Sequence, residues 1–124
     1  MRAIITGAGG GIGYKTAEVL GMAGYEVILT GRTNEREEAV MSALKEKGIK
    51  CWFFVCDATD ENAVNETFAK MEQQFGSIDL LVNNVGGLGG RQRVSVMETD
   101  FMRRVMALNF DSVFFATRAA LPML

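Results

Sequence analysis

The sequence predicts an α/β fold in which a doubly wound parallel sheet carries helices on both faces. Short apolar runs alternate four times with segments whose apolar residues recur at helical spacing, and the connections are short. One apolar run, Cys51 to Cys56, shows no polar alternation, as in strands covered on both faces. Alternating strands and helices form parallel sheets, and right-handed crossovers then give the strand order 3-2-1-4. We therefore expect residues 1–124 to form one domain.

The first half of the chain contains two strand–helix units. A strand at 3–5 runs into a glycine cluster, and the following helix ends at Gly24. A second strand at 26–30 leads through a loop at 31–34 into a helix that begins near Glu35 and ends at Gly48. The expected inner face of the first helix is Ile12, Thr16, Val19, Leu20 and Ala23, and that of the second is Ala39, Val40, Ala43 and Leu44.

The second half repeats the pattern. The third strand covers 51–56, and Thr59 or Asp60 caps a helix that ends at Gly76. A fourth strand covers 78–82, a glycine-rich stretch follows, and a single long helix runs from about Glu98 to Leu121. The expected inner residues are Val64, Phe68, Met71 and Phe75 in the third helix, and Phe101, Val105, Leu108, Ser112, Phe115 and Ala119 in the fourth.

Composition excludes several classes of function. A net charge of −2 and a pI near 5.2 argue against nucleic acid as a partner, because phosphate backbones attract a basic face. No apolar run approaches the roughly 18 residues that cross a bilayer, and no leader segment is evident, so we expect a cytoplasmic protein with no membrane partner. Cys51 and Cys56 lie on opposite faces of one strand, so we expect reduced, buried thiols and no metal site.

The glycine cluster after the first strand is the main candidate for a binding site. A glycine turn that opens a helix brings bare N–H groups and a positive helix end close to an anion, as a pyrophosphate requires. The alternative is that the glycines have only a structural role, in a tight turn whose residues need positive φ values. The strand–turn–helix context favours phosphate binding.

Four motifs in register resemble those of the short-chain dehydrogenase/reductase family. They are Thr6-Gly7-x-x-x-Gly11-Ile12-Gly13, the pair Asp57-Ala58, the segment Asn83-Asn84-Val85-Gly86, and Leu108-Asn109. The resemblance implies a Rossmann-like fold that is cut off after its fourth strand–helix unit. It also implies that Asn109 is a catalytic residue and that the cofactor is bound by Gly7, Gly9, Gly10, Gly11, Ile12, Gly13, Arg32, Asp57, Ala58, Asn84, Val85 and Gly86.

Three of these residues invite a second interpretation. Asp57 can cap a turn, and Asn83 and Asn84 can brace neighbouring strands as well as serve a cofactor. Val85 stands where the family usually has alanine, which adds two methyl groups near the expected cofactor path.

The end of the second strand indicates the cofactor. An NAD-specific site places a carboxylate there for the ribose hydroxyls, but this chain has Gly31 followed by Arg32. A guanidinium binds a 2′-phosphate through charge-assisted hydrogen bonds, so we predict NADP(H), with a solvated loop arginine as the alternative. The same two residues count against a methyltransferase, which needs an acidic residue at this place.

The family's remaining catalytic residues have no counterpart in these 124 residues. Neither Tyr14 nor Tyr25 is followed by lysine four positions later, and no fifth strand supplies the serine. We therefore expect an NADP-dependent oxidoreductase that interconverts a small-molecule carbonyl and an alcohol, with this chain inactive alone. The alternative is a non-catalytic module that binds a nucleotide or a partner. We also expect a homo-oligomer through the C-terminal helix or the exposed edge of the fourth strand.

Overall fold

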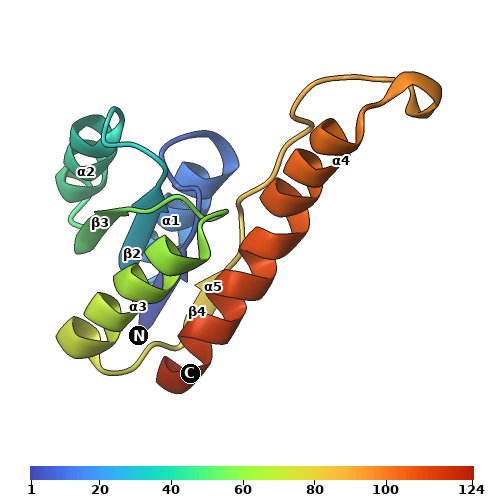
Figure 1. Ribbon diagram of the computed structural model, residues 1–124. Coiled ribbons are helices and arrows are strands. Elements are labelled where there is room, and N and C mark those ends of the chain that lie inside the picture. Colours follow the sequence, from blue (N-terminus) through green and yellow to red (C-terminus); the bar gives the residue numbers. More distant parts are fainter.

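The computed structural model describes residues 1–124 as a single parallel sheet covered by helices on both faces (Figure 1). Its elements, in chain order, are β1 (Arg2–Ile5), α1 (Gly11–Met22), β2 (Glu26–Gly31), α2 (Glu37–Glu46), β3 (Cys51–Val55), α3 (Glu61–Phe75), β4 (Leu80–Val82), the 3₁₀ turn η1 (Val94–Val96), α4 (Thr99–Met106), the π-helical segment η2 (Ala107–Asp111), α5 (Ser112–Ala120) and the 3₁₀ turn η3 (Leu121–Met123).

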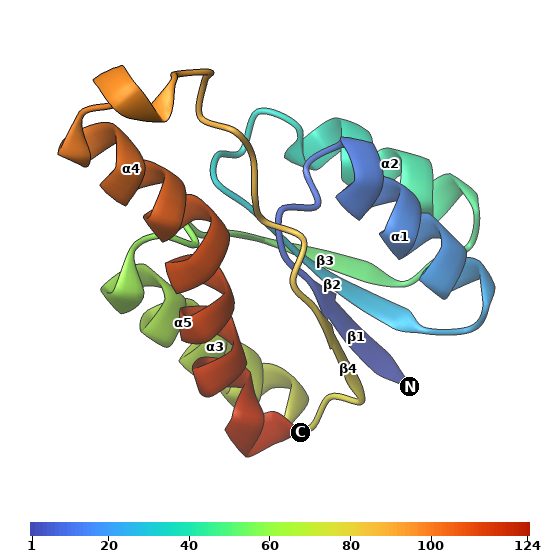
Figure 2. The same ribbon diagram turned by 90° about the vertical axis from the view of Figure 1, so that its right-hand side faces the viewer.

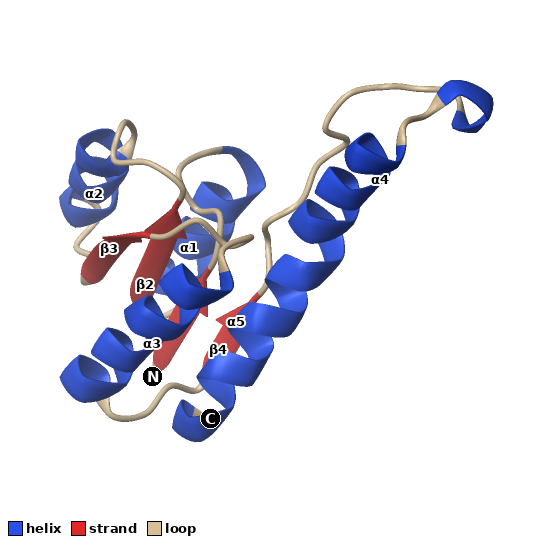
Figure 3. Cartoon of the chain, viewed as in Figure 1, coloured by secondary structure: helices blue, strands red, loops and turns tan.

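The four strands pair in the order β3-β2-β1-β4 and are all parallel (Figure 3), which confirms the predicted order. Ile4 lies opposite Ile28 on β2 and opposite Leu81 on β4. Viewed along the sheet, α1 and α2 cover one face while α3 and α5 cover the other (Figure 2). The carboxyl ends of all the strands therefore meet at one edge, where loops carry the candidate site.

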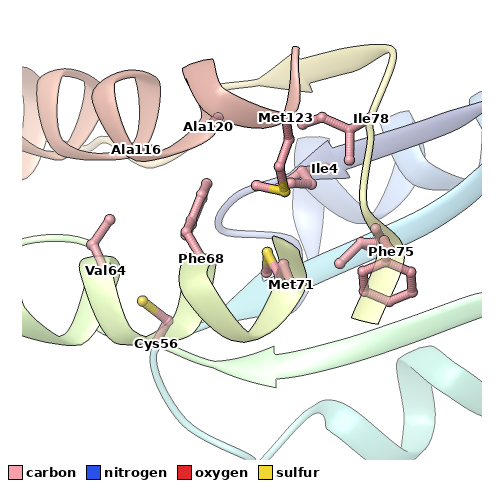
Figure 4. Packing of buried hydrophobic residues seen from close by; sticks show 11 residues of the cluster. Ile4, Cys56, Val64, Phe68, Met71, Phe75, Ile78, Ala116, Ala120 and Met123 are labelled. Carbon is pink, nitrogen blue, oxygen red and sulfur yellow. The ribbon is translucent and has the colours of Figure 1, made fainter. Parts of the chain in front are cut away.

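Alternate strand residues supply two separate cores. Ile5 and Leu29 point toward α1 and α2, whereas Ile4 and Ile28 point toward α3 and α5. Figure 4 shows the second core, in which Phe68 and Met71 of α3 lie between the sheet and the C-terminal helix. The two free cysteines belong to different cores, which confirms that they lie on opposite faces of the sheet.

The expected inner face of α1 is wrong for most of its large residues, although the predicted Leu20 is half-buried against the core. Ile12 is 78% exposed and Val19 is 58% exposed, while the buried residues are Gly13 and Ala17. Small side chains let this helix lie close against the sheet, so large apolar residues find no room there. The prediction from helical spacing selected large apolar residues and missed Gly13 and Ala17, the small residues that pack against the sheet.

The expected single long helix is also wrong in one respect, because η2 interrupts it between α4 and α5. A π-helical turn holds an extra residue and therefore rotates everything after it. Beyond Ser112 the fully buried residues are Ala116, Ala120 and Met123, while the predicted Phe115 and Ala119 are half-buried against the same core. In α3 the predicted inner face is confirmed, and Asp60 caps that helix by accepting from the Ala63 amide at 3.1 Å.

β3 differs from the prediction of a strand buried on both faces. It lies at the edge of the sheet, where Trp52, Phe53 and Phe54 are half-buried and Val55 is exposed. None of the helices has both the length and the apolar character needed to cross a bilayer.

Candidate functional site

The glycine turn connects β1 to α1 and has two positions that only glycine adopts readily. Gly7 and Gly11 have φ values of +63° and +55°, in the left-handed region. The Ala8 amide donates to the Thr30 carbonyl at 2.8 Å, which holds the turn against the end of β2. Loop and sheet are thus fixed to each other at the edge where the strands end.

The first turn of α1 is open toward solvent. Gly10 is the N-cap residue, and no side chain accepts from the amides of the first turn. Those amides have no partner within the helix, so they are free to donate to an anion. A Cβ on Gly13 would lie 2.6 Å from the Gly7 carbonyl oxygen, so glycine at this position lets the helix approach the turn.

Two polar residues lock the turn to the end of β4. The Asn84 amide donates to Thr6 Oγ1 at 3.0 Å, and Asn84 Nδ2 donates to the Gly7 carbonyl at 3.0 Å. The Asn83 side chain bonds to a different element, because its Nδ2 donates to Thr117 Oγ1 of α5 at 3.1 Å. Both asparagines therefore brace neighbouring elements, and Val85 packs against Gly7, where an added Cβ would lie 3.1 Å from its Cγ2.

An open cleft of about 290 Å³ lies beside the turn. It is lined by Gly7, Arg32, Cys56, Asp57, Ala58, Thr59, Asn84, Val85, Gly86 and Leu108. Seven of these were predicted as cofactor-binding residues; Cys56, Thr59 and Leu108 were not. Asp57 also makes the expected turn, because its Oδ1 accepts from the Thr59 amide at 3.0 Å and from the Thr59 hydroxyl at 2.7 Å.

The other predicted glycines lie outside this cleft. Gly10 and Gly11 border a second cavity of about 240 Å³, which Tyr14 and Arg36 also line. Ile12 is exposed at the start of α1, and Gly13 is buried beneath the turn. Arg36 was missed because its position in the sequence, next to a helix start, gives no sign that it reaches the glycine turn.

The end of β2 carries a glycine for a steric reason. Gly31 is buried, and a Cβ there would lie 2.6 Å from Cζ of Phe53 on the neighbouring strand. A longer side chain, including a carboxylate, would displace that ring. The next residue, Arg32, is exposed at the cleft and has no carboxylate within ion-pair distance.

Asn109 lies in the π-helical segment and joins it to the loop after β4. Its Oδ1 accepts from the Gly87 amide at 2.9 Å, and its Nδ2 donates to the Gly87 carbonyl at 2.7 Å and to the Val105 carbonyl at 2.9 Å. The residue is exposed, yet all its amide hydrogens have partners. Asn109 therefore lies where the helix departs from regular α geometry.

Two side chains near the turn, Cys56 and Tyr14, have raised pKa values. Burial raises the pKa of the Cys56 thiol above its ordinary value, although a hydrogen bond with Thr67 lowers it somewhat. Desolvation, followed by the hydrogen bond to Glu18, raises the pKa of Tyr14. Tyr14 therefore stays a phenol at neutral pH, donating to Glu18 at 3.2 Å. No group of three or more His, Cys, Asp or Glu side chains is placed to hold a metal ion.

Comparison with known proteins agrees with this arrangement. The short chain dehydrogenase family model matches residues 1–124. A 3beta-hydroxysteroid dehydrogenase of Mediterraneibacter gnavus is 36% identical over 115 residues, or 93% of this chain and 42% of that protein.

Two solved structures are similar in fold. An actinorhodin polyketide ketoreductase with NADPH has a TM-score of 0.90 at 29% identity, over 97% of this chain and 46% of that one. An NAD⁺-bound xylitol dehydrogenase has a TM-score of 0.92 at 34% identity, over 98% of this chain and 47% of that one. This chain thus spans about half the length of the relatives it matches. From its fold, its glycine turn and the family match over residues 1–124, the chain belongs to the short chain dehydrogenase family of oxidoreductases.

Proposed function

We propose that the chain binds NADP(H) across the glycine turn and that the protein interconverts a carbonyl and an alcohol. The observation that carries this proposal is the uncapped N-terminus of α1 close to a cleft that Asp57 and Asn84 line. The open amides suit a pyrophosphate, and the cleft has room for the adenosine. Bound NADPH would supply a hydride to the carbonyl carbon of the substrate.

The preference for NADP(H) rests on residues at the end of β2. Similar proteins carry either NADPH or NAD⁺, so the family alone does not decide the cofactor. Here a carboxylate at position 31 would have to displace the ring of Phe53, while Arg32 offers an unpaired guanidinium to a phosphate. A charge-assisted contact of this kind supports a preference for NADPH over NADH of about tenfold to a hundredfold in affinity.

Calorimetric titration of the chain with NADPH and with NADH tests this proposal. We expect tighter binding of NADPH, and Arg32→Gln should remove most of the difference while leaving NADH binding unchanged. Arg103→Gln is the matched control, since Arg103 is exposed on α4 and makes no ion pair. Equal affinity for the two cofactors in the unaltered chain would overturn the preference.

For the chemistry, we propose that Asn109 is the catalytic residue that these 124 residues contribute. Its hydrogen bonds fix the kinked helix against the loop at Gly87, close to the cleft that Leu108 lines. Tyr14 and Tyr25 lie in the α1–β2 region and neither precedes a lysine by four residues, so we expect no turnover from this chain alone. Oxidation of NADPH by the isolated chain in the presence of a ketone would contradict that expectation.

A second proposal concerns the assembly of the chain into a homo-oligomer. If no cofactor binds, the chain is instead a module that binds a partner. The outer face of the C-terminal helix exposes Phe110 of η2, Phe114 of α5 and Leu121 of η3 around a shallow apolar hollow of about 400 Å³. We propose that this face mediates a homo-oligomer, because apolar surface of this kind is seldom left open to water. Light scattering coupled to gel filtration tests it: Phe114→Glu should shift the assembly toward the monomer mass of 13.6 kDa.

A further inference from the structure

The outer side of β3 is a free edge of the sheet. The order β3-β2-β1-β4 leaves β3 paired with β2 alone, and Figure 3 shows it as the outermost strand on the side of α2. At the carboxyl end of this strand Val55 is 51% exposed. A strand edge with unpaired backbone groups is a ready template for a strand of another chain.

The register with β2 determines which backbone groups of β3 are unpaired. The Val27 amide donates to the Lys50 carbonyl at 3.0 Å, and the Cys56 amide donates to the Gly31 carbonyl at 2.8 Å. Because backbone groups alternate in direction along a strand, the even-numbered residues of β3 face β2 and the odd-numbered ones face outward. The residues with outward amides and carbonyls are Cys51, Phe53 and Val55. No turn, loop or side chain pairs with these groups.

This edge lacks the features that usually keep edge strands single. Such strands are protected by lysine, proline or a bulge, whereas Cys51–Val55 has no charged residue and no proline, and its pairing with β2 is regular. The side chains are apolar on both faces of the sheet. Phe53 packs with the core under α1 and α2, and Trp52 and Phe54 pack with the core under α3 and α5. The edge therefore suits a partner strand with apolar and aromatic side chains.

The β3 strand is complementary to itself when a second copy runs antiparallel. A two-fold axis beside Phe53 sets the outward amide and carbonyl of each Phe53 opposite those of the other copy. The same register pairs Cys51 with Val55 on one face of the sheet and Trp52 with Phe54 on the other. Every outward backbone group of the strand then has a partner. Aromatic cross-strand pairs add stability to such a sheet.

The charges at the two ends of β3 favour the antiparallel direction. Lys50 precedes the strand, and Asp57 follows it closely. Lys50 lies 3.8 Å from Glu26, but its side chain remains 68% exposed. An antiparallel copy brings the basic end of each strand beside the acidic end of the other, whereas a parallel copy in register sets like charges together.

We propose that β3 is a docking edge for a second copy of this chain, which pairs antiparallel about Phe53. Two four-stranded sheets then become one continuous sheet. This interface is separate from the apolar face of the C-terminal helix and does not depend on the cofactor. It is small, so we expect a dissociation constant of about 10–500 μM.

Amide exchange of the unaltered chain, followed by NMR at about 10 μM and about 1 mM, tests the proposal. We expect the amides of Phe53 and Val55 to exchange at least about fivefold more slowly at the higher concentration. The amides of Trp52 and Phe54, which face β2, should change little. In a mixture of labelled and unlabelled copies, we expect a contact between the Hα protons of Trp52 and Phe54 from different copies, as this register requires.

Proline at position 55 tests whether the backbone makes the contact. Val55→Pro removes an outward amide that has no bond to β2, so it should leave the fold intact and abolish the concentration-dependent protection of Phe53. Val55→Thr keeps the amide and is the matched control, which should retain the protection. Circular dichroism shows whether each variant is folded, and the unaltered chain decides the proposal even if Val55→Pro unfolds.

Three results would overturn the inference. The first is exchange at Phe53 and Val55 that does not depend on concentration up to about 1 mM, which includes association through the C-terminal helix alone. The second is full protection of Phe53 in a folded Val55→Pro variant. The third is contact of β3 with Leu80–Val82 of another copy, because this arrangement joins the two different edges and extends without closing.

Discussion

Asn109 pairs with Gly87 as one backbone position pairs with another in a sheet. The Gly87 amide donates to Asn109 Oδ1 at 2.9 Å, and Asn109 Nδ2 returns a hydrogen bond to the Gly87 carbonyl at 2.7 Å. A third bond, to the Val105 carbonyl, occupies the other amide hydrogen. One side chain therefore connects the π-helical segment to the loop that follows β4.

Asn109→Ala removes all three of these hydrogen bonds. Because the residue is exposed and water can replace some of them, we expect a loss of about 1–2 kcal/mol in the free energy of unfolding. Urea titration measures this loss, and amide exchange at Gly87 should accelerate. Asn65→Ala, at an exposed position of α3 with no side-chain bond, is the control and should change the stability by less than about 0.5 kcal/mol. Equal stability of both variants would mean that the Asn109–Gly87 pair contributes nothing to folding.

The adjacent asparagines Asn83 and Asn84 respond differently to aspartate. Asn84 Nδ2 donates to the Gly7 carbonyl, which can only accept, so Asn84→Asp sets two acceptors face to face. Asn83 donates to the Thr117 hydroxyl, which can rotate and donate to a carboxylate instead. We expect Asn84→Asp to cost about 1–3 kcal/mol and Asn83→Asp less than about 0.5 kcal/mol in urea titrations. The reverse order would contradict the assigned bonds.

Gly13 and Gly11 are glycines for different reasons, and alanine at each tests this. A Cβ on Gly13 would lie 2.6 Å from the Gly7 carbonyl oxygen and 2.9 Å from Cα of Ala8, so backbone atoms must move. Gly11 has open space around it but a φ of +55°. We expect Gly13→Ala to destabilise by about 2–3 kcal/mol and Gly11→Ala by about 1 kcal/mol, as thermal unfolding will show.

The two cysteines provide an internal comparison for ligand binding. Cys56 lines the cleft and Cys51 lies on the other face of the sheet, and burial raises the pKa of both thiols. Alkylation in the folded chain should therefore be slower than in urea, and NADPH should slow it further at Cys56 only. Mass spectrometry of the single variants Cys51→Ala and Cys56→Ala separates the two rates. Protection of Cys51 alone would contradict the proposed site.

The same thiols make stability depend on pH in the alkaline range. Their folded-state pKa values exceed that of the unfolded thiol, so their contribution is complete below the unfolded pKa of about 8.5. As the pH rises above that value, the unfolded chain loses protons first and stability falls. The double variant Cys51→Ala/Cys56→Ala should show a weaker decline between about pH 8 and 10 in urea titrations.

Much of the fold was predictable because its signals are local. Apolar runs located the strands, glycines marked the helix ends, and Asp60 was one of two candidates for the cap of α3. The right-handedness of crossover connections predicted the strand order. The buried face of α1 was not predictable, since Gly13 and Ala17 carry little hydrophobic signal. The π-helical segment η2 could not be predicted from helical spacing, because no proline or glycine marks it and its Asn109 bonds to the distant Gly87.

The candidate site was predictable where motif residues share one edge of the sheet. Asp57, Asn84 and Gly86 line the same cleft as Arg32 because parallel strands end together. The position of Arg36 was not predictable, since its contact with Gly10 depends on how the β2–α2 loop folds back. Gly31 was correctly singled out, but its steric reason, the Phe53 ring, requires the pairing of β2 with β3.

Amide hydrogen exchange with and without NADPH tests whether the cofactor binds across the glycine turn. We expect slower exchange at residues 7–13 and 84–87 when NADPH is bound, because these segments border the cleft and the open end of α1. The solvent face of α3, at residues 61–75, should be unaffected. Bound NADPH that leaves residues 7–13 unprotected, or that protects only the outer face of α5, would contradict it.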